Sequence, residues 1–219
     1  MTEIYLEIGN RRVFACALDW PGWCRAARTE DAALSALVAA AERYAPICLL
    51  AGISFDPVSA SARLEVIERV AGSATTDFGA LDVPACIDGE PLTANGAARI
   101  TSLTEAAWLT FRTVAGGAPA DLRKGPRGGG RDLREIVDHV LQTEVLHARM
   151  LGLRHRPFPS GDEAAADRVQ ADIVAAILSG SKTAEPTEGA GRGRRPARFV
   201  ARRSAWHALD HAWEIQDRA

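Results

Sequence analysis

The second half of the sequence contains four long stretches in which apolar residues recur at helical spacing, and this pattern restricts the fold more than any other feature. The stretches cover residues 101–115, 132–153, 161–178 and 199–217, and Asp132 stands at the N-cap position of the second. Each predicted helix carries an apolar stripe on one face. Helices of this kind bury their stripes by packing against one another, so the pattern predicts an all-α four-helix bundle.

The first seventy-five residues have a different, mixed pattern. Residues 3–8 alternate between polar and apolar side chains, as a half-buried strand does, and residues 13–18 form a second predicted strand after a turn at Gly9-Asn10. Residues 64–70 favour a further strand. An alanine-rich helix is predicted from an N-cap at Thr29 to about Tyr44, where Pro46 is expected to end it.

Composition and length fit a folded protein with two parts. The chain has 219 residues, of which 47% are hydrophobic and 25% charged, and its net charge of −2 gives no general attraction to nucleic acid or to an anionic membrane. We expect the α+β class: a small α/β module over residues 1–75, a linker or edge segment over residues 76–98, and the four-helix bundle over residues 99–219.

The cysteines indicate a reducing compartment. Cys16, Cys24, Cys48 and Cys86 all lie in the first ninety residues, and no two of them have the CxxC spacing of a zinc cluster or a thioredoxin-type motif. Neither a signal peptide nor a run of about 20 apolar residues is evident. We therefore expect a cytoplasmic protein with reduced cysteines and no membrane association.

Two histidines four residues apart, His207 and His211, lie on one face of the last predicted helix. They are separated by about 40° around the helix axis, a spacing at which one helix supplies two imidazoles to one divalent metal. His139 lies between Ile136 and Val140 on the side of its helix that faces the bundle interior, and it is the predicted third ligand. Three imidazoles leave one or two coordination positions open, as catalytic zinc sites do.

Other interpretations of the histidines stay open at this point. His147, about 80° from His139 on the same helix, is a rival third ligand, and His155 in a loop is expected to be solvated. A buried histidine can also be a core residue that a hydrogen bond satisfies. Leaving three of them buried and unpaired would cost on the order of 1–3 kcal/mol each, which favours the metal.

Two charged residues on the last helix are the predicted catalytic groups. Glu214 falls about 20° from His207 and can orient a ligand or accept a proton. Arg203, one turn before His207, can hold a carboxylate or phosphate near the metal. Alternatively, it belongs with the surrounding arginines, such as Arg202, to a solvated charged segment. Nucleic-acid binding is not expected, because no aromatic residues are interleaved with the arginines.

Four tryptophans are expected to pack inside the protein. Trp206 and Trp213 are seven residues apart on the last helix and are predicted to pack in the core or at a dimer interface. Trp20 and Trp23 flank a Pro-Gly turn and are predicted to anchor it on the core; the alternative is that they line an exposed binding surface.

The second half of the chain resembles the DinB-like superfamily. The resemblance covers roughly residues 100–219 and rests on His139, followed by Glu144 five residues later, and on the His207-x-x-x-His211 motif. It implies a four-helix bundle with a metal bound by His139, His207 and His211. It also implies relatives that are metal-dependent hydrolases or thiol S-transferases acting with bacillithiol or mycothiol, often as homodimers. The basic segment before the last helix is longer and richer in arginine than that family's pattern.

The N-terminal part is similar to HicB-like antitoxin domains. Residues 14–24 (FACALDWPGWC) form a predicted strand that ends in a D-x-P-G turn, and residues 29–34 (TEDAAL) start the helix that follows. The resemblance covers about 70 residues and implies a small α/β binding module. No helix-turn-helix or ribbon DNA-binding segment accompanies it.

Two functional hypotheses follow. The first is an enzyme that uses a divalent metal (zinc, nickel or iron), with or without a low-molecular-weight thiol, on a small substrate, neutral or anionic, as a homodimer. The second is a non-catalytic binding or regulatory protein, in which the N-terminal module recognises a partner and the metal site is structural or vestigial. An antitoxin-like partner of a toxin is a variant of the second.

Overall fold

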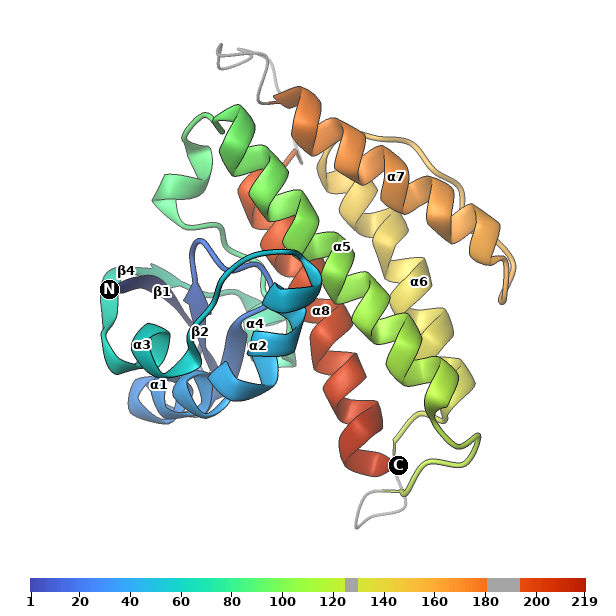
Figure 1. The fold of residues 1–219 in the computed structure, drawn as a ribbon, viewed down its shortest axis with the longest axis horizontal. Helices are drawn as coiled ribbons and strands as arrows, with labels where there is room; N and C mark the ends of the chain where they lie inside the picture. The colour runs from blue at the N-terminus through green and yellow to red at the C-terminus, as the bar shows by residue number, and fades with distance from the viewer. Residues whose placement is uncertain (125–129, 181–193) are drawn as a thin grey trace.

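The computed structural model describes residues 1–124, 130–180 and 194–219, and within these ranges a four-stranded sheet with short helices precedes a bundle of four long helices (Figure 1). The strands are β1 (Thr2–Ile8), β2 (Val13–Ala17), β3 (Cys24–Ala27) and β4 (Leu64–Ala71). The bundle helices are α5 (Ala94–Gly117), α6 (Leu133–Met150), α7 (Glu163–Gly180) and α8 (Ala197–Arg218). The predicted α+β class is confirmed.

The sheet is mixed, with strand order β3-β2-β1-β4. β1 and β2 form the predicted antiparallel hairpin, closed by a hydrogen bond from the Gly9 amide to the Arg12 carbonyl (2.8 Å), and β4 joins β1 in parallel. β3 pairs with β2 and was not predicted. Its four residues are too few for an alternating pattern and closely follow the Pro-Gly turn, so no periodic pattern indicates a strand there.

Short helices surround the sheet: α1 (Glu30–Ala39), α2 (Ala41–Leu50), α3 (Pro57–Ala62), α4 (Ala74–Phe78) and the 3-10 helix η1 (Cys86–Gly89). Thr29 caps α1 as predicted, accepting a hydrogen bond from the Ala32 amide. The prediction that Pro46 ends the helix is wrong. The chain bends by 51° between α1 and α2, and α2 then continues through Pro46. Proline removes one backbone donor, and burial of Tyr44 and Ile47 offsets that loss.

The bundle begins earlier than the sequence indicated. α5 starts at Ala94 behind the N-cap Thr93, inside the segment 76–98, which also contains η1. Asp132 caps α6 as predicted, within a capping box. α8 packs against α5, α6 and α7, so it is the element on which the bundle converges. Residues 125–129 and 181–193, which lie between the predicted helices, are outside the described residues.

The sheet packs directly on α8. The ring of Trp206 meets that of Phe14 edge-on, with centroids 5.4 Å apart, and one apolar cluster runs from Ile4 and Leu6 into the bundle. Trp23 is fully buried and its indole N–H donates to the Leu37 carbonyl (2.9 Å), which confirms the predicted anchor.

Trp213 is also buried, and the guanidinium groups of Arg25 and Arg43 stack on its ring. All four cysteines are free in the structure, and Sγ of Cys16 lies 2.7 Å from Sγ of Cys24. Among the described residues, no single helix is long and apolar enough to cross a bilayer. The bent pair α1–α2 meets the criteria of length and composition only.

Candidate metal centre

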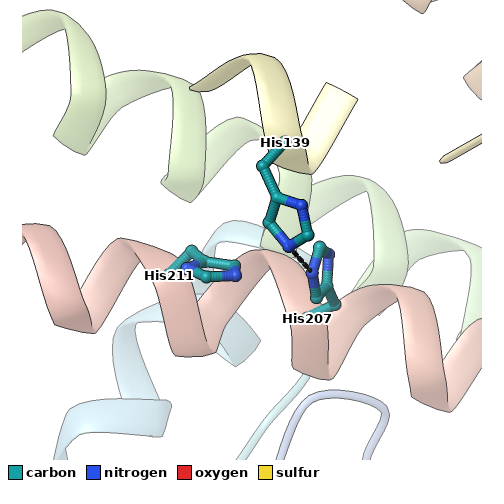
Figure 2. A group of neighbouring side chains, drawn as sticks. All are labelled: His139, His207 and His211. Carbon is teal, nitrogen blue, oxygen red and sulfur yellow. Dashed lines mark hydrogen bonds between the residues drawn. The ribbon is translucent and has the colours of Figure 1, made fainter. Parts of the chain in front are cut away.

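Three histidines converge where α6 crosses α8 (Figure 2). His139 comes from α6, and His207 and His211 come from successive turns of α8. Each offers a ring nitrogen, and these atoms all lie within 4.8 Å of one another. Nε2 of His139 is 3.1 Å from Nε2 of His207, a contact drawn in Figure 2. The structure thus brings together the three residues predicted as metal ligands.

The spacing of these nitrogens fits a small divalent cation. Tetrahedral coordination with metal–nitrogen bonds of about 2.0–2.1 Å places two ligand nitrogens roughly 3.3 Å apart. The distance between the Nε2 atoms of His139 and His207, 3.1 Å, is close to that value. The remaining imidazole, His211, lies with its ring centroid 4.8 Å from that of His207 and 5.1 Å from that of His139. Small side-chain adjustments would therefore let all three bind one ion.

Glu214 fixes the orientation of His211. Its Oε2 atom lies 2.8 Å from Nδ1 of His211, and its Oε1 atom accepts a hydrogen bond from Nη1 of Arg218 (2.6 Å). A carboxylate at Nδ1 favours the tautomer that carries its hydrogen there, which leaves Nε2 free to bind a metal. Glu214, a predicted catalytic residue, is therefore placed to orient a ligand.

Burial keeps two of the histidines neutral. His207 is 8% exposed, and burial, followed by the charges of His147, His211 and His139, lowers its pKa well below the usual value. Burial, then Arg131 and His211, lower the pKa of His139 to about 4. Neutral imidazole is the form that binds a metal, so neither group needs to lose a proton at pH 7.

The rival ligand His147 belongs to a separate buried network behind His207. Its Nδ1 atom lies 3.2 Å from Oε2 of Glu144, which also accepts a hydrogen bond from Ser204 (2.8 Å), and Ser204 accepts one from the Trp108 indole (2.9 Å). Glu144 is completely buried. No sequence motif marks Ser204; its only signal is that it stands three residues before His207 and so shares its side of α8.

The remaining predicted residues have other partners. Nη1 of Arg203 lies 3.4 Å from Asp82. The guanidinium that was predicted to bind a substrate anion is therefore already paired with a carboxylate of the protein. The prediction that His155 is solvated is wrong, because its ring pairs with Asp172 (3.2 Å) and its side chain is only 20% exposed. Arg202, expected among solvated arginines, is instead buried and forms two hydrogen bonds to Asp88 (2.9 and 2.8 Å).

Comparison of the chain with models of known families, with curated proteins and with solved structures finds no match. The structure itself shows a mixed-sheet module, a helical bundle and a cluster of three histidines that could hold a metal. The resemblances to the DinB-like superfamily and to HicB-like domains stay predictions from the sequence.

Proposed function

We propose that this protein is a metal-dependent enzyme of the DinB-like type, a hydrolase or thiol S-transferase acting on a small-molecule substrate. His139, His207 and His211 would hold a divalent ion. The observation that carries the proposal is the convergence of three imidazoles from two helices, with no fourth ligand in the cluster among the described residues. Imidazole ligands suit zinc, nickel and iron alike, so the donor set does not choose between them.

Access to the cluster favours catalysis over a purely structural metal. Structural zinc sites are closed by four protein ligands, whereas this cluster offers three. His139 and His211 are only partly buried, so solvent and small molecules can approach them. A divalent cation with open positions supplies Lewis-acid activation of a water molecule or a low-molecular-weight thiol.

The chain's own residues would hold the reacting groups in place. Glu214 orients His211 through the 2.8 Å contact at Nδ1, and Arg218 in turn holds Glu214. Ser204, hydrogen-bonded to both Glu144 and Trp108, fixes the part of α8 that leads into His207. Hydrogen bonds of this kind around metal ligands raise metal affinity and hold the imidazole rings in a fixed orientation.

The partners proposed with this activity follow from charge and resemblance. The net charge of −2 gives no reason to expect nucleic acid or a membrane surface as a partner. The DinB-like resemblance supports a homodimer, and the free cysteines support a cytoplasmic location. A free guanidinium other than that of Arg203, which pairs with Asp82, would be needed to bind an anionic substrate.

Elemental analysis of untagged protein tests the proposal. We expect close to one divalent ion per chain in the wild type, and its loss in His207→Ala and in His211→Ala. His155→Ala is the matched control, because this histidine pairs with Asp172 in a loop away from the cluster. It should retain the metal. His147→Ala separates the rival ligand from His139, and we expect it to keep the metal as well.

The outcome decides between the two functional hypotheses. Metal that is lost selectively from the cluster variants supports the site, and a screen of hydrolysis and thiol transfer with the loaded wild type then tests for an enzyme. A wild type that contains no metal and cannot be reloaded contradicts the proposal. The N-terminal module would then become the place to look for function, as a recognition domain for a protein partner.

A further inference from the structure

A cavity of about 800 Å³ lies between α5, α6 and the start of α7, apart from the histidine cluster. Leu133, Val137 and Leu141 line it from α6 at a spacing of four residues, so one face of that helix forms a wall. His139 is about 200° around the helix from Val137 and faces α8 instead. The cavity and the cluster thus occupy opposite sides of α6.

The floor of the cavity is apolar and its volume is that of a ligand site. Phe111 and Leu141 are buried beneath it, and Val137 and Ala115 are partly buried at its sides. Pockets for small organic molecules are typically about 300–1,000 Å³ and mostly apolar, with a few polar groups that fix orientation. A ligand with one or two rings would cover these apolar side chains.

The charged residues at the mouth favour a cation. The lining carries four carboxylates and two guanidinium groups: Asp121, Asp132, Asp138, Glu163, Arg112 and Arg134. Arg112 is already paired with Asp167 (2.5 Å), which lies outside the lining. Asp138 accepts a hydrogen bond from Ser160, and Asp132 caps α6. The carboxylates of Asp121 and Glu163 form no hydrogen bond or ion pair within the described ranges.

We propose that this cavity between α5, α6 and α7 is a second ligand site, which takes an organic cation: an apolar ring system that carries an amine. The rings would lie on Phe111 and Leu141, and the ammonium group would face Asp121 and Glu163 at the mouth. The inference does not depend on the metal, because none of these residues belongs to the histidine cluster.

Two adjacent glycines make a matched test. Gly116 lines the cavity and Gly117 does not, and a Cβ atom at either position would meet nothing within 4 Å. Both end α5, so leucine changes helix propensity alike at the two positions. Gly116→Leu adds an apolar side chain at the cavity and Gly117→Leu adds the same side chain outside it.

The measurement is calorimetric binding of 1-naphthylmethylamine and 1-naphthoate to the full-length protein at pH 7. These probes share the ring system and differ in charge. We expect the amine to bind more tightly than the carboxylate, Gly116→Leu to weaken the amine by at least about tenfold, and Gly117→Leu to leave it unchanged. Replacing both Asp121 with Asn and Glu163 with Gln should cost about two- to fivefold for the amine only.

Amine affinity that is unchanged in a folded Gly116→Leu variant overturns the site. If that variant does not fold, Ala120→Leu, which lines the cavity from the segment after α5, gives the same decision. Equal affinities for the amine and the carboxylate, or no binding of either, overturn the proposed cation. Loss of metal in the histidine variants has no bearing on these results, so this inference and the proposed enzyme can fail independently.

Discussion

α8 carries two buried polar clusters that are built on opposite principles. Near its N-terminus, Arg202 is 1% exposed, and both of its terminal nitrogens bond to Asp88, with a further bond to the Leu18 carbonyl (3.2 Å). One turn later, His207 is almost as well buried, yet its Nδ1 atom has no partner and its Nε2 atom faces another imidazole nitrogen.

The difference between these two clusters separates a structural site from one that could hold a ligand. The Arg202–Asp88 pair combines opposite charges, so the protein itself balances the buried charge, although Nε of Arg202 has no hydrogen-bond partner, and the pair ties η1 to the bundle. The three residues of the histidine cluster all offer an imidazole; His211 and His139 disfavour a proton on His207, and His211 disfavours a proton on His139. Neutral imidazoles in this arrangement could hold a divalent cation.

The largest expected effect comes from breaking the buried Arg202–Asp88 pair. Arg202→Met leaves the carboxylate of Asp88 buried without its counter-ion, and we expect a loss of about 3–5 kcal/mol in the free energy of unfolding. Urea denaturation measures it. Arg69→Met is the control, because the pair of Arg69 with Glu30 is exposed and should contribute no more than about 1 kcal/mol. A loss for Arg202→Met as small as that control would show that the pair does not support the fold.

These clusters also show how far the sequence can predict the structure. The spacing of His207 and His211 lies within one helix, where 3.6 residues per turn decides which side chains are neighbours, and the apolar stripe of α6 then indicates the facing His139. The partner of Arg202 lies 114 residues away along the chain. Nothing local in a run of arginines reveals one that is buried against a distant aspartate.

The same dependence on distant contacts explains the elements that local sequence patterns did not predict correctly. β3 has four residues and is defined by its pairing with β2, and α2 accommodates Pro46 because Tyr44 and Ile47 on either side of it are buried. Asp82, which holds Arg203, comes from a segment without any periodic pattern. Periodicity therefore predicts long elements and the faces they share, whereas tertiary pairing decides short elements and charged side chains.

A smaller effect is expected from the support of the histidine cluster. Glu214→Gln keeps a side-chain oxygen for Nδ1 of His211 but removes the negative charge, and we expect zinc affinity to fall about 10- to 100-fold. Competition with a chromogenic zinc chelator measures it. Asp210→Asn is the matched control on the same helix, because Asp210 pairs with Arg25. Equal zinc affinities in the two variants would mean that Glu214 does not support the site.

The smallest expected effect is a pH dependence that the histidine cluster produces and the Arg202–Asp88 pair does not. Burial lowers the pKa of His207 and of His139, the latter to about 4, so in acid the unfolded chain binds protons that the folded protein does not. Metal-free protein should therefore lose stability as the pH falls below the ordinary histidine value of about 6.5 toward 4, and regain it as the pH rises.

Arg202 keeps its charge across this pH range, so its pair with Asp88 should not contribute to the change of unfolding free energy with pH that the histidines produce. Urea denaturation in EDTA between pH 4.5 and 7, for the wild type beside His207→Gln, isolates it. Removing His207 should lower the slope by at most one proton, about 1.4 kcal/mol per pH unit. Parallel curves for the two proteins would mean that His207 takes up protons equally well folded and unfolded. The contrast between the two clusters would then lose its physical basis, because the imidazoles could be satisfied by protons and would not require a metal.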